Sequence, residues 1–146
     1  MDDTLELARV LKTLDVDMID CSMGGIAKDV GTDRRSAYAY QAEFAGVIRR
    51  EVGIKTNAVG LIVHAHHAEH IIATGLADTV AIAREALYNP NWAIDAAHKL
   101  GADPEFEALP DRQRFWFHYR NRGMTDFLPS THSVGSIAGL TELETV

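Results

Sequence analysis

Apolar residues recur along the chain at two spacings, one typical of helices and one typical of buried strands. Between residues 3 and 15 they lie three or four positions apart, which predicts an amphipathic helix with an inward stripe of Leu7, Val10, Leu11 and Leu14. Short apolar runs without polar alternation are typical of parallel strands that are covered on both faces. These patterns predict helices at residues 3–15, 40–52, 64–74 and 89–100, and strands at residues 16–22, 54–62 and 79–83.

Residues with strong positional preferences mark the ends of these helices. Asp3 is expected to cap the first helix, and Glu6 completes a capping box three positions later. Gly53 should end the second helix. Asn89 and Pro90 should open the fourth, because Asn accepts from unpaired amides and Pro needs no donor at the first helical position. The inward positions expected in the second and third helices are Phe44, Val47, Ile48, Val52, Ala68, Ile71 and Ile72.

The stretch from residue 78 to residue 92 has the order of a phosphate-binding unit. A short apolar strand ends at Arg84, a few residues follow, and a helix begins at Asn89. Many (β/α)8 barrels hold a phosphate in their last βα unit in this way, at the N-terminus of a short extra helix. Gly60 and Ser22 lie near the ends of the two preceding predicted strands.

Each of these residues also has a purely structural interpretation. Arg84 could form a surface ion pair with Glu85, Gly60 could be a packing glycine, and Ser22 could close a turn. Cys21 is expected to be a small core residue, because no basic partner lies near it in the sequence.

The predicted elements alternate between helix and strand, which indicates an α/β fold with a parallel sheet and right-handed crossovers. A closed (β/α)8 barrel needs eight strands and about 250 residues, whereas this chain has 146 residues. We therefore expect residues 1–101 to form the C-terminal portion of a TIM (β/α)8 barrel, with three parallel strands and flanking helices. Residues 102–146 are expected to form a partly disordered C-terminal extension, and residues 23–37 a long exposed loop.

Composition places the chain among globular proteins. Apolar residues make up 47% and charged residues 24%, and the net charge of -7 argues against non-specific nucleic-acid binding. The sequence lacks the apolar run of roughly 18 residues that a membrane span requires, and its acidic start is unlike a signal peptide. A single cysteine suits a reducing compartment. We therefore expect a cytoplasmic protein with no membrane or nucleic-acid partner.

Four segments together resemble the old yellow enzyme family of FMN-dependent NAD(P)H oxidoreductases, and especially its bacterial NADPH dehydrogenase or ene-reductase branch. The resemblance extends from about Leu5 to Gly101, with the segments in the same order and spacing. Each segment alone is a weak signal, whereas four in register are specific. The segments are VDMIDCS at residues 16–22, YQ and FA within residues 40–45, AVGLI at residues 58–62, and AREALYNP with the nearby tryptophan at residues 83–92.

The resemblance implies a TIM barrel that binds FMN at the carboxyl ends of its strands and uses NAD(P)H to reduce an activated alkene as its small-molecule substrate. The positions that match the family's phosphate contacts are Ser22, Gly60, Ala83 and Arg84. The family usually has glycine where this chain has Ala83, so the extra methyl group would face the phosphate. No segment matches the family's substrate-polarising residues, which belong to the first part of the barrel. We therefore expect no catalytic residue in this chain.

Two further groups of residues have both a structural and a functional interpretation. His64, His66, His67 and His70 could form a metal cluster, but their spacing matches no zinc motif, and an exposed helix face is favoured. The aromatic and basic segment at residues 112–122 is expected to dock on a missing barrel half or a partner subunit rather than to stack on a cofactor.

Three alternatives to the oxidoreductase stay open at this point. The chain could be a catalytically silent truncated fragment that acts only through protein association. It could be a metal-binding module built on the histidines, or another phosphate-binding TIM barrel. Because the predicted sheet has open edges, we expect association, either as a homo-oligomer or with the missing half of the barrel.

Overall fold

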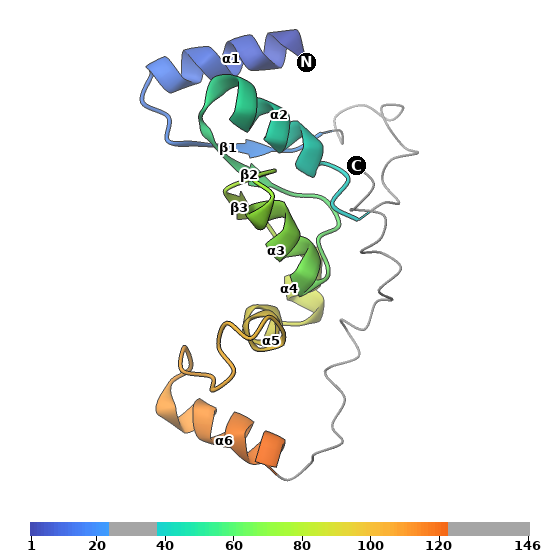
Figure 1. The fold of residues 1–146 in the computed structure, drawn as a ribbon, viewed down its shortest axis with the longest axis vertical. Helices are drawn as coiled ribbons and strands as arrows, with labels where there is room; N and C mark the ends of the chain where they lie inside the picture. Colours follow the sequence, from blue (N-terminus) through green and yellow to red (C-terminus); the bar gives the residue numbers. More distant parts are fainter. Residues whose placement is uncertain (24–37, 123–146) are drawn as a thin grey trace. The chain divides into compact units, whose positions relative to one another are not determined.

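The computed structural model describes residues 1–23 and 38–122 (Figure 1). Most of the expected loop at residues 23–37 and the expected tail from residue 123 therefore lie outside the described residues. The chain forms two compact units. The first contains Met1–Val63 and His67–Ile82, and the second contains His64–His66 and Ala83–Val146. Within the described residues, no helix is long and apolar enough to cross a membrane.

The first unit is built on a parallel sheet whose three strands lie in sequence order (Figure 1). The strands are β1 (Met18–Cys21), β2 (Lys55–Ala58) and β3 (Thr79–Val80), and the helices that precede them are α1 (Asp2–Thr13), α2 (Ala42–Val52) and α3 (Ala65–Ala73). The prediction of an α/β fold with three parallel strands and flanking helices is confirmed. All three strands are shorter than predicted.

The two faces of this sheet differ in exposure. Cys21 and Ala58 are buried, whereas Met18 and Lys55 on the opposite face are exposed. Helix α2 packs against both β1 and β2 and covers the buried side. The prediction that the strands are covered on both faces is therefore wrong for the described residues, in which the helices bury only one side.

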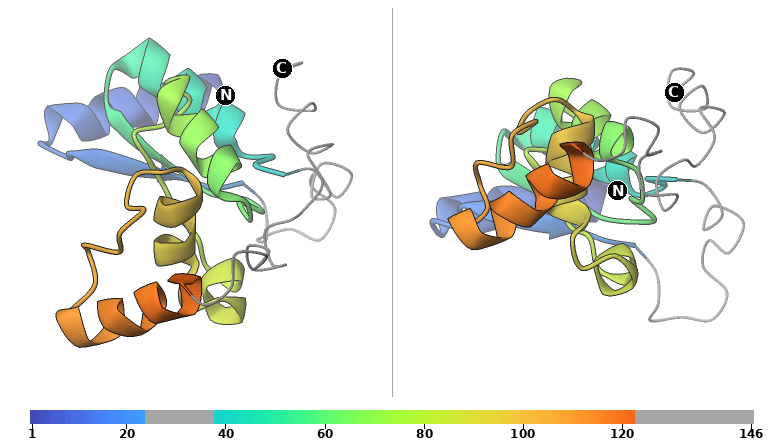
Figure 2. Two further views of the ribbon diagram at one scale, coloured as in Figure 1. Left: turned by 60° about the horizontal axis from the view of Figure 1, so that its bottom comes forward. Right: turned by 90° about the horizontal axis from the view of Figure 1, so that it is seen from below.

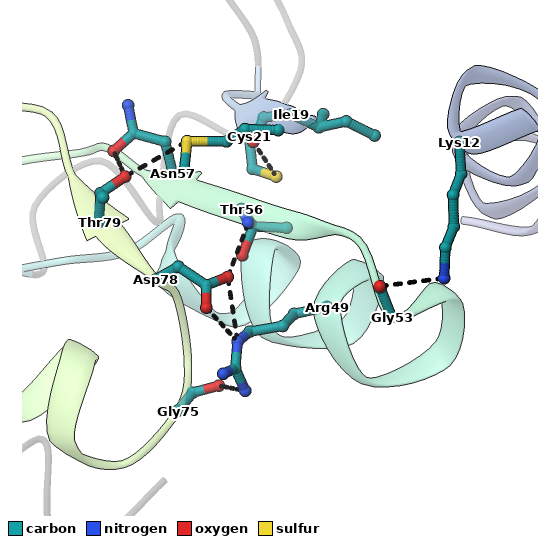
Figure 3. A network of polar contacts seen from close by, with 11 residues as sticks. Lys12, Ile19, Cys21, Arg49, Gly53, Thr56, Asn57, Gly75, Asp78 and Thr79 are labelled. Atoms are coloured by element: carbon teal, nitrogen blue, oxygen red, sulfur yellow. Dashed lines mark hydrogen bonds and ion pairs between the residues drawn. The ribbon is translucent and has the colours of Figure 1, made fainter. Parts of the chain in front are cut away.

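A row of polar side chains crosses the open face of the sheet. Strand pairing aligns Asp20 with Asn57 and Asn57 with Thr79. The Asn57 amide donates a hydrogen bond to the Asp20 carboxylate. The Thr79 hydroxyl donates to Asn57 Oδ1 at 2.9 Å (Figure 3). Cross-strand pairs of this kind stabilise one register, which matters for strands this short.

The packed face of helix α1 overlaps only in part with the one that its apolar pattern predicted. The helix lies beside α2 (Figure 1, Figure 2). Its buried residue is Ala8, and Leu11 of the predicted stripe is half-buried, whereas Leu7, Val10 and Leu14 are exposed. The predicted Asp3 cap is also wrong, because the helix begins at Asp2 and its N-cap residue is Met1, without a side-chain cap.

Helix α2 buries small residues rather than the large ones that the pattern favoured. Its buried positions are Ala42, Ala45, Gly46 and Ile48, and of these only Ile48 was expected. Small side chains allow a close approach: a Cβ on Gly46 would lie 3.1 Å from Leu76 Cδ2. The predicted stop is confirmed, since Gly53 follows the helix with a φ of 66° and its N–H bonds to the Arg49 carbonyl.

The exposed histidine face that the sequence favoured is present only in part, because His66 is exposed but two of the four histidines around α3 are buried. His64 is 7% exposed and His67 is 1% exposed, and the ring centroid of His67 lies 4.9 Å from that of Tyr38. Burial lowers the pKa of His64, and this effect outweighs the opposing influence of Glu85. The helix spacing explains the result, because positions 64, 67, 68 and 71 share one face and all four are buried. Ile72, which was expected inward, is exposed.

The described part of the second unit contains three helices and their connections. These helices are α4 (Arg84–Tyr88), α5 (Trp92–Lys99) and α6 (Asp111–Arg122). The predicted cap of α5 is wrong: the N-cap residue is Asn91, and the side chain of Asn89 instead accepts a hydrogen bond from the Asn91 N–H at 3.2 Å. Pro90 consequently precedes the helix rather than opening it.

An aromatic cluster holds α6 to the connection that precedes it. Phe106 is buried, stacks on His98 with ring centroids 4.6 Å apart, and meets Phe117 at 5.1 Å. Phe115, Trp116 and Tyr119 point elsewhere and are between 60% and 66% exposed. The segment that the sequence marked as aromatic and basic is therefore a helix with an exposed aromatic face.

Candidate functional site

The carboxyl ends of β1 and β2 lie side by side. Strand pairing places Cys21, the last residue of β1, opposite Ala58, the last residue of β2. Ser22 follows Cys21 directly and is exposed, and Gly60 lies two positions after Ala58 and is buried. The first unit thus brings two of the predicted phosphate contacts to the same edge of the sheet.

The side chain of Gln41 joins this edge to the start of α2. Its Oε1 accepts a hydrogen bond from the Met23 N–H at 3.0 Å, and its Nε2 donates to the Met23 carbonyl at 3.3 Å. The residue is 5% exposed and occupies the N-cap position of α2, where its side chain forms no capping bond. The acceptor and the donor of the buried Gln41 amide therefore both bond to the backbone of Met23, which follows β1.

Gly60 lies against the same turn and has little room for any side chain. A Cβ at this position would approach Gln41 Cγ to 3.1 Å and Tyr40 Cε1 to 3.1 Å. Its φ of 116° is a conformation that other residues rarely adopt. These contacts account for the glycine by packing, and they leave its proposed contact with phosphate as a prediction.

Ala83 and Arg84 belong to the second unit, where they open the short helix α4. The φ of Ala83 is −113°, so the backbone at this position does not require the glycine that the old yellow enzyme family usually has. Arg84 is exposed, and within the described residues it forms no ion pair with Glu85 or with any other carboxylate. The described residues therefore do not support the alternative that Arg84 forms a surface ion pair.

The amino ends of β2 and β3 are joined by a charged network that the sequence did not reveal. One oxygen of Asp78 accepts from the Thr56 N–H at 2.9 Å, and the other accepts from Arg49 Nε at 3.1 Å (Figure 3). Arg49 also donates to the Gly75 carbonyl at 3.2 Å. The hydrogen bond from Thr56 is the main cause that lowers the pKa of Asp78, and Arg49 adds to it.

Cys21 fulfils the expectation of a core residue. It is 5% exposed, and its thiol donates to the Ile19 carbonyl at 3.5 Å. Burial raises the pKa of the thiol, and the neighbouring Asp20 carboxylate raises it further. Such a thiol is poorly suited to act as a nucleophile.

The part of the chain that the structure describes holds no group of three or more His, Cys, Asp or Glu side chains arranged for a metal ion. His64 and His67 are buried and belong to different units. The chemistry of the described residues thus points to the strand ends rather than to the histidines.

Comparison with known proteins identifies relatives of this chain. An NADPH dehydrogenase of a Geobacillus species is 44% identical over 99 residues, which cover 68% of this chain and 28% of that protein. The NADPH dehydrogenase of Geobacillus thermodenitrificans is 39% identical over 115 residues, covering 78% of this chain and 32% of the relative. That of Listeria monocytogenes is 38% identical over 116 residues, covering 80% and 33%.

This chain therefore spans about a third of the length of these relatives. A family match extends over residues 1–103, a range that includes both the sheet and the first two helices of the second unit. The resemblance to the old yellow enzyme family is confirmed by these matches. The chain belongs to the NADH:flavin oxidoreductase / NADH oxidase family.

Proposed function

We propose that this chain supplies the FMN phosphate-binding portion of a (β/α)8-barrel NADPH dehydrogenase. Residues 1–101 would be the barrel portion, and Ser22, Gly60, Ala83 and Arg84 would contact the phosphate. The observation that carries the proposal is the parallel sheet, whose carboxyl edge presents Ser22 beside Gly60. Barrel enzymes bind phosphate at this edge, near the ends of their last strands.

The chemistry of these residues fits a phosphate group. Ser22 offers an exposed hydroxyl, and Arg84 offers an exposed guanidinium that forms no ion pair among the described residues. A guanidinium presents a planar fork of donors that matches phosphate oxygens. Ala83 would contribute its backbone N–H, which a methyl side chain does not remove.

Bound FMN would relay hydride from NAD(P)H to an activated alkene, which is the ene-reductase chemistry that we propose for the whole enzyme. The residues of this chain would hold and orient the phosphate end of the cofactor. None of them is proposed to polarise the substrate. We propose that the polarising groups lie in the part of the enzyme that this chain does not cover.

A second candidate function is association with another chain. Two exposed surfaces support it, the open polar face of the sheet and the apolar stripe of α1. In that stripe Leu7 is 57%, Val10 46% and Leu14 67% exposed, which is unusual for the apolar face of a helix. A partner that supplies the rest of the barrel would cover both surfaces.

Titration of the purified chain with FMN, followed by flavin fluorescence, tests the cofactor proposal. We expect saturable binding that weakens about tenfold or more in Arg84→Ala, because one charge-assisted contact is lost. Arg50→Ala is a matched control, since Arg50 is an exposed arginine on α2 that pairs with Glu51. Riboflavin, which lacks the phosphate, should bind much more weakly than FMN. Equal binding of the two flavins, or an Arg84→Ala variant that binds like the wild type, would contradict the proposal.

A further inference from the structure

The two strand ends that carry Ser22 and Gly60 are connected by one side chain. Gln41 bonds to both backbone groups of Met23, the residue after Ser22, from 18 positions away in the sequence. A Cβ on Gly60 would lie only 3.1 Å from the Cγ of Gln41. A change at Gln41 would therefore reach both strand ends at once.

The contact with Met23 is directional. A buried side-chain amide that both accepts from and donates to one residue fixes the two peptide groups that flank that residue, much as a strand partner does. Replacing either half of the amide leaves a part-buried backbone group of Met23 without this partner, which is costly. The first of these peptide groups joins Ser22 to Met23, so the position of Ser22 depends on the contact.

The contact with Gly60 is steric. The Tyr40 ring and the Gln41 side chain lie over the Gly60 backbone, and the Ala39 N–H bonds to the Leu61 carbonyl at 3.5 Å. The turn at residues 38–41 is thereby attached to the segment that follows β2. This turn places Gln41 between the two strand ends.

We propose that Gln41 is a positioning residue that sets the spacing between the phosphate contacts at Ser22 and Gly60 without touching the phosphate itself. The inference rests on the proposed FMN-binding function. A helix-capping role does not explain the side chain, because Gln41 forms no side-chain cap on α2. A contribution to stability alone would be separable from this role, because it would leave the FMN affinity of the folded chain unchanged.

Gln41→Glu provides a test with a pH signature. Above its pKa, the introduced carboxylate accepts from the Met23 N–H but faces the Met23 carbonyl without a proton to donate. Below its pKa, the carboxylic acid regains that donor and reproduces the wild-type pair. Burial and the facing Met23 carbonyl should raise the pKa of the introduced carboxyl well above its ordinary value of about 4.3. We therefore expect FMN to bind about tenfold more weakly to the variant than to the wild type at pH 7.5, and nearly equally at pH 5.

Two further variants complete this test. Gln41→Met keeps the length of the side chain but can neither donate an N–H nor accept through oxygen, so its FMN binding should be weakened at both pH values. Gln113→Glu makes the same charge change at an exposed position of α6, and its FMN affinity should follow the wild type throughout. The ratio of variant to wild-type dissociation constants is the quantity compared, because the FMN phosphate itself titrates near pH 6. Urea unfolding at both pH values shows that each variant is folded.

The outcomes separate this inference from the function on which it rests. If the folded wild-type chain does not bind FMN, or if Arg84→Ala binds as well as the wild type, the proposed function fails and the role of Gln41 fails with it. If wild-type binding is sensitive to Arg84 but Gln41→Glu and Gln41→Met match the wild type at both pH values, only the positioning role is overturned. If Gln41→Glu binds weakly at pH 7.5 but the neutral Gln41→Met binds like the wild type, the weakening is charge repulsion by the carboxylate, and the positioning role is also overturned.

Discussion

The two edges of the sheet in the first unit are held together by different chemistry. At the amino edge, Asp78 joins Thr56 of β2 to Arg49 of α2 through charged contacts. At the carboxyl edge, the neutral amide of Gln41 joins Met23 to the turn against Gly60. The amino edge is held by charged side chains, whereas the carboxyl edge is held by a neutral side chain.

This difference agrees with the proposal that the sheet belongs to a barrel enzyme. Residues at the amino edge of a barrel serve stability, whereas the carboxyl edge carries the ligand. A carboxylate such as Asp78 would repel a phosphate, whereas a neutral amide is compatible with the proposed contacts of an anion with Ser22 and Arg84. We therefore expect substitutions at the amino edge to change the free energy of unfolding, and substitutions at the carboxyl edge to change FMN affinity as well.

The largest effect on stability is expected for Asp78→Ala. It removes the acceptor of the buried Thr56 N–H and the partner of Arg49, and should lower the free energy of unfolding by about 2 to 3 kcal/mol. Urea unfolding measures this loss. Asp17→Ala, at an exposed position before β1, should change it by less than about 0.5 kcal/mol. An effect of Asp78→Ala no larger than that of Asp17→Ala would contradict a stabilising role for the amino edge.

The same carboxylate gives this prediction a pH dependence. The pKa of Asp78 is lower in the folded chain than in the unfolded chain, so its stabilising effect is fully present above the unfolded value of about 3.9. The effect is lost as the pH falls through the folded value, because the unfolded state then binds the proton more readily. The difference in unfolding free energy between the wild type and Asp78→Ala should therefore shrink when the pH is lowered below about 4.

Gly60→Ala tests the carboxyl edge and should cost about 2 kcal/mol of unfolding free energy. The φ of 116° is unfavourable for alanine, and the new methyl group would lie 3.1 Å from both Tyr40 Cε1 and Gln41 Cγ. Gly101→Ala is the matched control, because Gly101 also has a positive φ, of 68°, but no atom lies within 4 Å of the position that a Cβ would take there. That control should cost about 1 kcal/mol. Equal losses of unfolding free energy in the two variants would show that crowding by the turn adds nothing to the cost of Gly60→Ala.

Lys12→Met should have the smallest effect, a loss of about 1 kcal/mol. At the C-terminal end of α2, the Lys12 ammonium donates to the Val52 carbonyl at 2.8 Å. It also donates to the Gly53 carbonyl at 3.0 Å (Figure 3). Methionine keeps much of the apolar stem but cannot donate. Thermal unfolding measures the change, and FMN affinity should not respond, because this contact belongs to the amino edge. A change in FMN affinity would contradict the expectation that substitutions at the amino edge affect stability alone.

The sequence determined the features that depend on local chemistry and on the order of elements. Gly53 ends α2 with a positive φ, as its position predicted, and the alternation of helices and strands predicted the parallel α/β fold. The motif at the end of β2 helped to identify the family, because backbone requirements such as the positive φ of Gly60 restrict the residue type directly. These features need little knowledge of what lies nearby in space.

Tertiary structure decided which side of each element is buried and which distant residues meet. The apolar stripe of α1 predicted the burial of Leu7, yet Leu7 is exposed and the small Ala8 is buried in this helix, which packs against α2. His67 is buried although its neighbours suggested exposure, and Gln41 reaches a backbone 18 positions away. A pattern of hydrophobicity records what a helix is able to bury, but the partner that packs against it decides what it does bury. The physical reason is that burial and hydrogen bonding between distant segments are properties of pairs of elements, whereas caps and turns are properties of a few consecutive residues.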